Sequence, residues 1–384
     1  MCPDGVPMVA LGEICNKITD GSHNPPAGID YSSFRMISSQ NIFNDKLILN
    51  DIRFLNEEDF WKENRRTDVS QGDLLLTIVG AIGRCYVVKN EDLPFTCQRS
   101  VAVLKLHKTN VIPEYVHECI VNINSYLETQ ANGAAQKGLY LKQIAKIQIP
   151  LPPLSIQRRI VEILDKFTSL VSSLDSEIAL RQKQYEYYRN KLLSFEEGDE
   201  GVEWKKLGDV GNVYMCKRIM KAQTDSEGEV PFFKIGTFGK EPDAYISREL
   251  FETYKTNYNY PEVGDVLISA AGTIGRTVVF DGTPSYFQDS NIVWIRNDES
   301  LVYNSYLKYF YTVAEWDIDY GGVVARLYND KLKATLIPIP PKSVQHSIVQ
   351  TLDTFESLIA NLKKERKLRQ KQYEYYREKL LTFE

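Results

Sequence analysis

Histidine and cysteine are residue types that can hold a metal ion or attack a substrate, and their spacing is the first test for either chemistry. The four histidines are scattered, and no two have the spacing of metal ligands. The six cysteines contain no C-x-x-C pair, and only Cys216 lies in the second half of the chain. This distribution argues against a zinc site and against a disulfide framework. We therefore expect reduced thiols, no bound metal and a cytoplasmic protein.

The segment Asn24-Pro25-Pro26 matches the start of the catalytic loop of amino-group DNA methyltransferases. That loop continues with an aromatic residue that stacks on the flipped base, whereas this sequence continues with Ala27. No glycine-rich strand–turn–helix for S-adenosylmethionine precedes the segment, and the chain has no G-x-x-x-x-G-K-[ST] phosphate-binding loop. We interpret the segment as a proline-stiffened loop and expect no catalytic residue in this chain.

Two glycine-containing turns are the first candidates for binding. Gly80 to Arg84 and Gly272 to Arg276 each lie between two strand-like runs and end in an arginine. Glycine at such a turn supplies the positive φ of a hairpin. No helix follows either turn, which argues against a nucleotide-binding loop. Arg84 and Arg276 could still reach a phosphate or a guanine.

Two polar segments are the second candidates. Each precedes a predicted strand, and their candidate side chains are Gln98, Arg99 and Ser100 in one and Gln288, Asp289 and Asn291 in the other. Side chains of these types donate to and accept from base edges in DNA. The two segments differ in sequence while the pattern around them persists, as expected for reading two different half-sites. The alternative interpretation is an ordinary surface loop in each place.

The sequence contains a long internal repeat. The string LRQKQYEYYR occurs at Leu180 to Arg189 and again at Leu368 to Arg377, an offset of 188 residues (368 minus 180). The offset is close to half of the 384 residues, and it is much longer than the period of a solenoid. Ile149 to Pro153 likewise matches Ile337 to Pro341. The chain is therefore expected to consist of two halves with the same layout and a pseudo-twofold relation.

Each half ends in a predicted long helix. From Ser155 to Phe195 the apolar residues recur in steps of four and three, which is the seam of a coiled coil. The second half repeats this seam between Ile348 and Leu380. We expect the two helices to pair antiparallel, with these side chains at the helix-pair and partner interface: Phe167, Leu174, Tyr185, Tyr188, Phe355, Leu362, Tyr373 and Tyr376. The alternative is two unrelated helices, each packed on its own domain.

The remainder of each half is predicted to be a globular α+β domain, mostly antiparallel. In the first half the predicted strands are 34–37, 74–79, 85–88 and 100–106, and the predicted helix is 111–127. In the second half the predicted strands are 232–235, 266–269, 277–280 and 291–295, and the predicted helix is 303–314. The acidic segment Glu196 to Gly201 is a candidate linker between the halves.

Composition narrows the class of protein. Charged residues make up 25% of the chain and its formal net charge is −5. That charge argues against a protein that coats nucleic acid without regard to sequence, although it permits a basic contacting face. The longest apolar run, Leu74 to Ile82, is too short to cross a bilayer, and no signal peptide pattern is present. We expect no membrane association.

The sequence resembles a known family. The paired segments Ile149 to Phe167 and Ile337 to Phe355, the doubled Y-E-Y-Y-R-x-K-L-L-x-F and the G-D-L-L-L-T-I-V-G-A-I-G-R segment look like the DNA specificity subunit of a type I restriction-modification system. The resemblance spans the whole chain. It implies a first target recognition domain at 1–153, a long helix at 154–197, a second recognition domain at 198–341 and a second long helix at 342–384.

The resemblance also implies a function and a set of partners. Each recognition domain would read one half of a split, asymmetric site in double-stranded DNA, and the antiparallel helices would act as a ruler that sets the gap. Two modification (methyltransferase) subunits would dock on the helices, and restriction (motor-nuclease) subunits would complete the restriction form. No cofactor is expected on this chain: S-adenosylmethionine, and ATP with Mg²⁺ in restriction, would be bound by the partners.

Two other functions are consistent with parts of the sequence. One is a self-contained methyltransferase or nuclease, against which the missing cofactor loop argues. The other is a structural adaptor that dimerises partner proteins through its helices without reading DNA. We expect a DNA-binding specificity subunit and not an enzyme.

Overall fold

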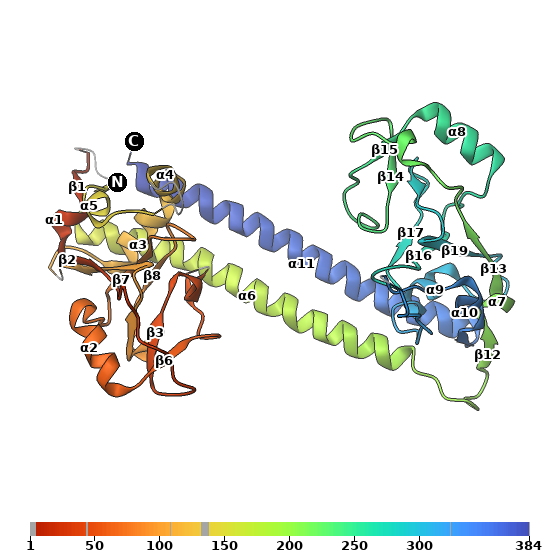
Figure 1. The fold of residues 1–384 in the computed structure, drawn as a ribbon, viewed down its shortest axis with the longest axis horizontal. Coiled ribbons are helices and arrows are strands. Elements are labelled where there is room, and N and C mark those ends of the chain that lie inside the picture. Colours follow the sequence, from red (N-terminus) through yellow and green to blue (C-terminus); the bar gives the residue numbers. More distant parts are fainter. Residues whose placement is uncertain (1–4, 44, 108, 132–137, 323, 384) are drawn as a thin grey trace. The chain divides into compact units, whose positions relative to one another are not determined.

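The computed structural model describes residues 5–43, 45–107, 109–131, 138–322 and 324–383, which divide into two compact units (Figure 1). Unit 1 comprises Met1–Asp175 and Lys364–Glu384, and unit 2 comprises Ser176–Lys363. Each unit therefore contains one globular part together with one portion of each of the two long helices.

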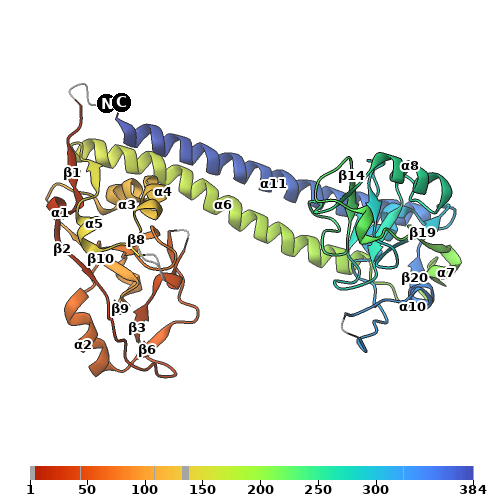
Figure 2. The same ribbon diagram turned by 45° about the horizontal axis from the view of Figure 1, so that its top comes forward.

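The centre of unit 1 is a four-stranded antiparallel sheet in the order β2-β10-β7-β8 (Figure 2). Its strands are β2 (Cys15–Asp20), β10 (Val101–Leu106), β7 (Leu74–Thr77) and β8 (Cys85–Val87). A second sheet, β6-β3-β9, contains β6 (Arg53–Leu55), β3 (Phe34–Ile37) and β9 (Phe95–Cys97), with β3 and β9 parallel. Two short pairs complete the strands: β1 (Met8–Ala10) with β11 (Gln148–Pro150), and β4 (Ile42–Phe43) with β5 (Lys46–Leu47).

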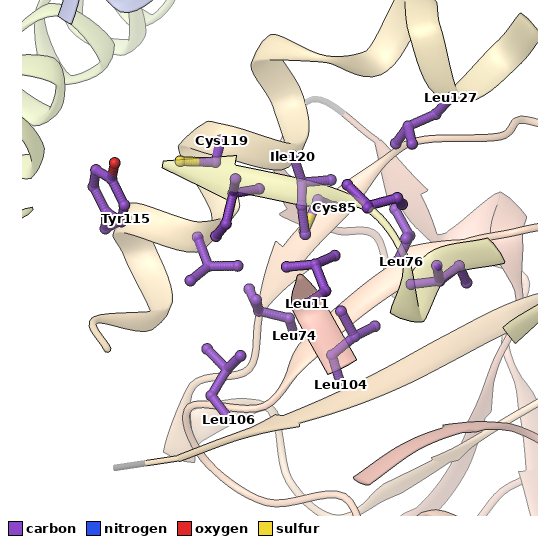
Figure 3. Packing of buried hydrophobic residues seen from close by; sticks show 14 of the residues in the cluster. Leu11, Leu74, Leu76, Cys85, Leu104, Leu106, Tyr115, Cys119, Ile120 and Leu127 are labelled. Atoms are coloured by element: carbon purple, nitrogen blue, oxygen red, sulfur yellow. The ribbon is translucent and has the colours of Figure 1, made fainter. Parts of the chain in front are cut away.

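Both faces of the central sheet of unit 1 are buried, which explains its continuous apolar runs. On β10, Ala102 and Leu104 belong to one buried cluster, while Val101 and Val103 belong to another on the opposite face. Figure 3 shows part of the first cluster, in which residues of the sheet pack against Ile120. The helices of the globular part are α1 (Leu11–Ile14), α2 (Glu57–Thr67), α3 (Pro113–Asn122), α4 (Asn124–Gln130) and α5 (Leu141–Ala145).

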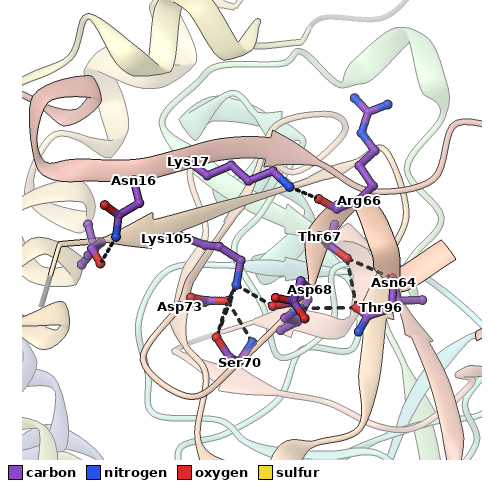
Figure 4. A network of polar contacts seen from close by, with 12 residues as sticks. Asn16, Lys17, Asn64, Arg66, Thr67, Asp68, Ser70, Asp73, Thr96 and Lys105 are labelled. Carbon is purple, nitrogen blue, oxygen red and sulfur yellow. Dashed lines mark hydrogen bonds and ion pairs between the residues drawn. The ribbon is translucent and has the colours of Figure 1, made fainter. Parts of the chain in front are cut away.

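Lysines on the sheet hold the end of α2 (Figure 4). Lys105 Nζ donates to Asp68 O at 2.5 Å and lies 2.7 Å from Asp73 Oδ2. Lys17 Nζ donates to the carbonyl of Arg66 at 2.5 Å. Cations at the C-terminus of a helix satisfy its free carbonyls and complement its dipole. These contacts therefore fix α2 against the sheet.

Unit 2 repeats this plan. Its four-stranded antiparallel sheet, β13-β19-β16-β17, contains β13 (Gly211–Met215), β19 (Ile292–Asn297), β16 (Val266–Ser269) and β17 (Thr277–Val279). The second sheet, β15-β14-β18, contains β15 (Tyr245–Ile246), β14 (Val230–Phe233) and β18 (Tyr286–Phe287), and β12 (Glu203–Lys206) pairs with β20 (Leu336–Ile339). Its shorter helices are α7 (Leu207–Val210), α8 (Arg248–Asn257), α9 (Asn304–Phe310) and α10 (Asn329–Ala334).

The two long helices are α6 (Leu154–Leu192) and α11 (Lys342–Thr382). They pair antiparallel within each unit: in unit 1 Phe167 stacks on Tyr376 and Asp175 binds Arg366, and in unit 2 Tyr188 stacks on Phe355. The α+β class, the duplicated layout and the long paired helices expected from the sequence are confirmed.

Several predicted bounds were wrong in detail. The single helix predicted at 111–127 is two helices, α3 and α4, because the chain leaves helical geometry at Ile123, whose ψ is 15°. The helix predicted at 303–314 ends at Phe310, where the cap N–H of Tyr311 returns to Leu307 O. The first long helix ends at Leu192, three residues before the predicted end. The strand predicted at 232–235 lies two residues earlier, at Val230–Phe233.

Candidate nucleic-acid interface

Four loop segments of unit 1 meet at one end of its central sheet. The segment after β7 joins the segment before β10, because Ile78 N donates to Ser100 O at 2.9 Å. The loop after β2 lies beside them, since Arg99 N donates to Ser22 O at 2.9 Å. The loop after β3 completes the group, with Ser39 N donating to Ser100 Oγ at 3.1 Å. We call this group the recognition edge of unit 1.

Unit 2 brings the corresponding segments together. Ala270 N donates to Asn291 O at 2.7 Å, which joins the segment after β16 to the segment before β19. The loop after β14 contacts the same segment, because Ile235 N donates to Gln288 Oε1 at 2.9 Å. The loop after β13 reaches it through an ion pair between Arg218 and Asp289. These segments form the recognition edge of unit 2, and the polar segments singled out in the sequence lie within the two edges.

The two glycine turns are alike and are stabilised by their own side chains. Gly80, Gly83, Gly272 and Gly275 all have positive φ, as expected for a hairpin. Thr77 Oγ1 donates to Ala81 O and accepts from Arg84 N, and Ser269 Oγ makes the same pair of bonds with Thr273 O and Arg276 N. The hydroxyl of the preceding strand therefore closes each turn.

The arginines that end these turns are anchored within their own unit. Arg84 Nη1 donates to Ile42 O at 3.0 Å, and its guanidinium lies 4.9 Å from the centre of the Phe43 ring. Arg276 Nη1 donates to Phe238 O at 2.9 Å. Both side chains are half-buried and hold the neighbouring loop to the turn. A DNA contact by either arginine stays a prediction.

The predicted polar residues differ in whether their side chains already have hydrogen-bond or ion-pair partners. Arg99 is exposed, and among the described residues its side chain has no hydrogen-bond or ion-pair partner. Ser100 and Gln288 accept from backbone N–H groups, and Asp289 binds Arg218. The Oδ1 atom of Asn291 is buried without a partner in the described part of the chain. The recognition edges therefore mix free side chains with side chains that shape the loops.

The Asn24-Pro25-Pro26 segment is held as a loop. Pro26 O accepts from Arg53 Nη1 at 2.9 Å. The neighbouring His23 bonds Asp20 at 2.7 Å, and Asp20 also pairs with Arg66. No group of three or more metal-ligating side chains is found among the described residues. The described cysteines are free and buried, and burial raises the pKa of each thiol.

The predicted interface side chains of the long helices pack within both units. Besides the stacked pairs, Tyr373 OH donates to Glu118 Oε2 at 2.8 Å in unit 1. In unit 2 Tyr185 OH donates to Glu356 Oε1 at 3.2 Å, and Lys308 Nζ binds the same carboxylate at 2.6 Å. Leu174 and Leu362 are half-buried. Tyr185 and Tyr373, which match at the repeat offset, therefore each reach a carboxylate, from α11 in unit 2 and from the globular part in unit 1.

The carboxylate in unit 1 belongs to a buried polar cluster that sequence analysis did not single out. His117 on α3 lies 3.3 Å from Asp45 and 3.7 Å from Glu118. The cluster borders a cleft of about 870 Å³ that α3, α6, α11 and the β4–β5 hairpin line. Burial opposes the charge of His117, but hydrogen bonds to the two carboxylates outweigh it and raise its pKa to about 9.

The raised pKa predicts that alkaline pH weakens unit 1. The pKa of an ordinary histidine is 6.5, so the stabilisation is complete below about pH 6.5 and is lost as the pH rises through about 9. We expect a loss of about 3 kcal/mol over this range, at 1.36 kcal/mol per pKa unit. Urea unfolding between pH 6 and pH 10 measures it. His117→Gln is the control, and the same alkaline slope in that variant would contradict the assignment to His117.

The paired helices expose the same set of apolar side chains once in each unit. In unit 1 this set is Leu170, Leu368, Tyr375 and Tyr376, and in unit 2 it is Leu358, Leu180, Tyr187 and Tyr188. The two sets match residue for residue at the repeat offset of 188 (358 minus 170). We call each set a repeated apolar face. Exposed apolar side chains that recur in this way are candidates for an interaction site.

Comparison with known proteins also divides the chain into two similar parts. The family model described as the type I restriction modification DNA specificity domain matches the chain twice, at residues 3–180 and 199–370. No described helix is long and apolar enough to span a membrane.

Two relatives are similar in sequence. A putative type I restriction enzyme specificity subunit of Haemophilus influenzae is 57% identical over 263 residues, which are 65% of this chain and 68% of the relative. The specificity subunit of the type I restriction enzyme EcoR124I/EcoR124II of Escherichia coli is 35% identical over 263 residues, 62% of this chain and 63% of the relative.

Two solved structures share the fold. A chain from a structure of the assembly and conformational transition of a type I restriction-modification system has a TM-score of 0.63 and 18% identity, with 98% of both chains covered. The S subunit of a type I system from M. genitalium has a TM-score of 0.57 and 13% identity, with 99% of this chain and 98% of that chain covered.

Proposed function

This chain belongs to the family of type I restriction-modification DNA specificity subunits, and on that premise we propose that it reads a bipartite, asymmetric DNA site. Each recognition edge would read one half-site through base edges and nearby phosphates. The observation that carries the proposal is the duplication of that edge: both units bring the corresponding four loop segments together, through backbone bonds and side-chain contacts. Different side chains on a shared scaffold suit two half-sites of different sequence.

We propose that the long helices set the gap between the half-sites. Helices α6 and α11 contain 39 and 41 residues. At 1.5 Å per residue each is roughly 60 Å long, or about 18 base pairs at 3.4 Å each. Two short half-sites and a gap fit within that length.

Two modification subunits and the restriction subunits are the proposed partners. One modification subunit would dock on each repeated apolar face, because identical surfaces bind identical partners. Catalysis would reside in those partners, with S-adenosylmethionine on the modification subunits and ATP with Mg²⁺ on the restriction subunits. This chain would supply sequence recognition and assembly.

Mapping of methylated adenines tests the function. The chain is coexpressed with its modification subunit, and methylated positions in the host DNA are sequenced. We expect one motif with two specified parts and a fixed gap, and loss of that motif when this chain is omitted. Methylation at unrelated positions, with the complex still assembled, would favour the structural adaptor instead.

Docking on the repeated apolar faces predicts a change in stoichiometry. Tyr187 and Tyr375 are 60% and 55% exposed, and large exposed aromatic residues often dominate binding interfaces. Tyr187→Ala or Tyr375→Ala alone should lose one modification subunit, and the double variant should lose both. Native mass spectrometry measures the complex. Tyr126→Ala, at a tyrosine of 54% exposure on α4, is the control, and two subunits retained by the double variant would contradict docking there.

A further inference from the structure

Arg218 is placed differently from the other arginines of the recognition edges. It lies in the loop after β13, and its Nε is 2.7 Å from Asp289 Oδ2. The Arg218 side chain remains 65% exposed, whereas Asp289 is only 17% exposed. The carboxylate is therefore fixed in the edge and holds an arginine that projects to solvent. Arg84 and Arg276, by contrast, donate a terminal nitrogen to a backbone carbonyl.

The contact with Asp289 leaves the useful part of the guanidinium available. Arginine has five N–H donors in a rigid plane, and here Nε is engaged by the carboxylate. The two terminal nitrogens can then donate side by side. The O6 and N7 acceptors of guanine in the major groove have the geometry that such a pair fits. An arginine oriented by a carboxylate is already arranged for this contact, which lowers the entropic cost of making it.

In unit 1 the exposed arginine near the corresponding contact is Arg99, which belongs to the segment before β10. Arg99 directly follows Gln98, as Asp289 directly follows Gln288. The loop after β2, which faces Arg99, contains Ser22 and His23 and no arginine. Thus each edge has one exposed arginine beside this contact between two loops, before β10 in unit 1 and after β13 in unit 2. An exposed guanidinium in both edges suits contact with a DNA half-site.

We propose that Arg218, oriented by Asp289, reads a guanine in the half-site that belongs to the recognition edge of unit 2. The inference rests on the proposed function and adds a base preference and the residue responsible for it. A phosphate contact is the competing role. Lys221 is an exposed cation in the same loop and provides the comparison, because its ammonium group has no hydrogen-bond or ion-pair partner among the described residues and suits a phosphate.

The test uses the complete complex of this chain with its modification subunits and a double-stranded DNA library with random inserts. Bound sequences are compared for the wild type, Arg218→Ala, Arg218→Lys, Asp289→Asn and Lys221→Ala. We expect Arg218→Ala to lose about 5- to 150-fold in preference for guanine at one position of one half-site. Arg218→Lys should keep only part of that preference, because an ammonium group lacks the planar pair of donors. Asp289→Asn should weaken the same preference, and Lys221→Ala should weaken binding to all sequences alike.

Three outcomes separate the possibilities. If Arg218→Ala weakens binding to all sequences equally and keeps the guanine preference, Arg218 contacts phosphate and the inference is wrong. If the wild-type complex selects no bipartite motif, the proposed function fails before Arg218 is tested. Thermal unfolding of each variant shows whether a lost preference reflects unfolding, and the other half-site, unchanged in the same experiment, is an internal control.

Discussion

Replacement of Gln157 by leucine should cost roughly 2 to 4 kcal/mol of folding free energy, because one buried and two partly buried backbone groups would lose their partner. Gln157 is fully buried in the first turn of α6. Its Oε1 accepts from Ile112 N at 3.0 Å, and its Nε2 donates to Asn110 O at 3.0 Å and to Pro152 O at 2.8 Å. Leucine has a similar volume but cannot replace any of these bonds.

Urea unfolding of the full chain measures this loss, and hydrogen exchange at the Ile112 amide reports the site directly. Gln182→Leu, at an exposed position of the same helix, should change the stability by less than about 0.5 kcal/mol. Gln345→Leu should resemble Gln157→Leu, since Gln345 makes the same three bonds with Tyr303 N, Leu301 O and Pro340 O. A cost below about 1 kcal/mol at Gln157 would show that these groups find other partners.

Gln157 and Gln345 are part of the repeat, but their buried hydrogen-bonding role was not predicted from the sequence. Gln157 and Gln345 stand at the repeat offset of 188 residues, each in the first turn after a proline-rich segment. A polar residue kept at a matching position beside apolar ones is a sequence signal for a buried hydrogen-bonding role. Their partners lie 42 to 47 residues earlier in the chain, except for the nearby prolines. No local pattern identifies such partners.

The large elements were predictable because their signals are local and repeated. The step of three and four residues at Phe167, Val171 and Leu174 depends only on helix geometry. The stacked pairs Phe167–Tyr376 and Tyr188–Phe355 then follow from two copies of one antiparallel seam. Strand bounds were approximate, since both faces of the central sheets are buried and the usual alternation is absent.

The candidate interface was only partly predictable. The segments around Gln98 and Gln288 were found because each carries polar residues just before a predicted strand, at matching places in the two halves. Arg218 was missed because its importance comes from Asp289, 71 residues away. Arg84 and Arg276 looked available in the sequence, whereas each donates to a backbone carbonyl about 40 residues earlier. Sequence spacing identifies the loops but does not show which of their charges are already paired.

The contacts of the repeated tyrosines show how identical strings can fit two different surroundings. Tyr373 donates to Glu118 on α3, while Tyr185 donates to Glu356 on α11. Near Glu118 the basic group is His117, and near Glu356 it is Lys308 on α9. Each unit therefore places one carboxylate and one cation near its tyrosine. In unit 1 both groups lie on α3, whereas in unit 2 the carboxylate lies on α11 and the cation on α9. The helix string can stay constant because the hydroxyl needs only an acceptor.

Replacement of Glu118 by alanine should therefore cost about 3 to 5 kcal/mol of folding free energy, because it removes one charged partner from a buried cluster. The Tyr373 hydroxyl, buried at the end of α11, would lose its acceptor, and protonated His117 would keep only Asp45, which is about half exposed. Glu118→Gln keeps an acceptor for Tyr373 and should cost less. It should also move the alkaline loss of stability to lower pH, since one of the carboxylates that raise the pKa of His117 is gone.

A double-mutant cycle with Tyr373→Phe isolates the contact between α11 and α3. Urea unfolding of Glu118→Ala, Tyr373→Phe and the double variant should give a coupling of about 1.5 to 3 kcal/mol, the range for a hydrogen bond to a charged group. The pair Tyr185→Phe and Glu356→Ala in unit 2 is the matched control. It should couple more weakly, because Glu356 is partly exposed and also binds Lys308. Additive losses within 0.5 kcal/mol in unit 1 would mean that the tyrosine is held by packing against its neighbours, and that the carboxylate stabilises only His117.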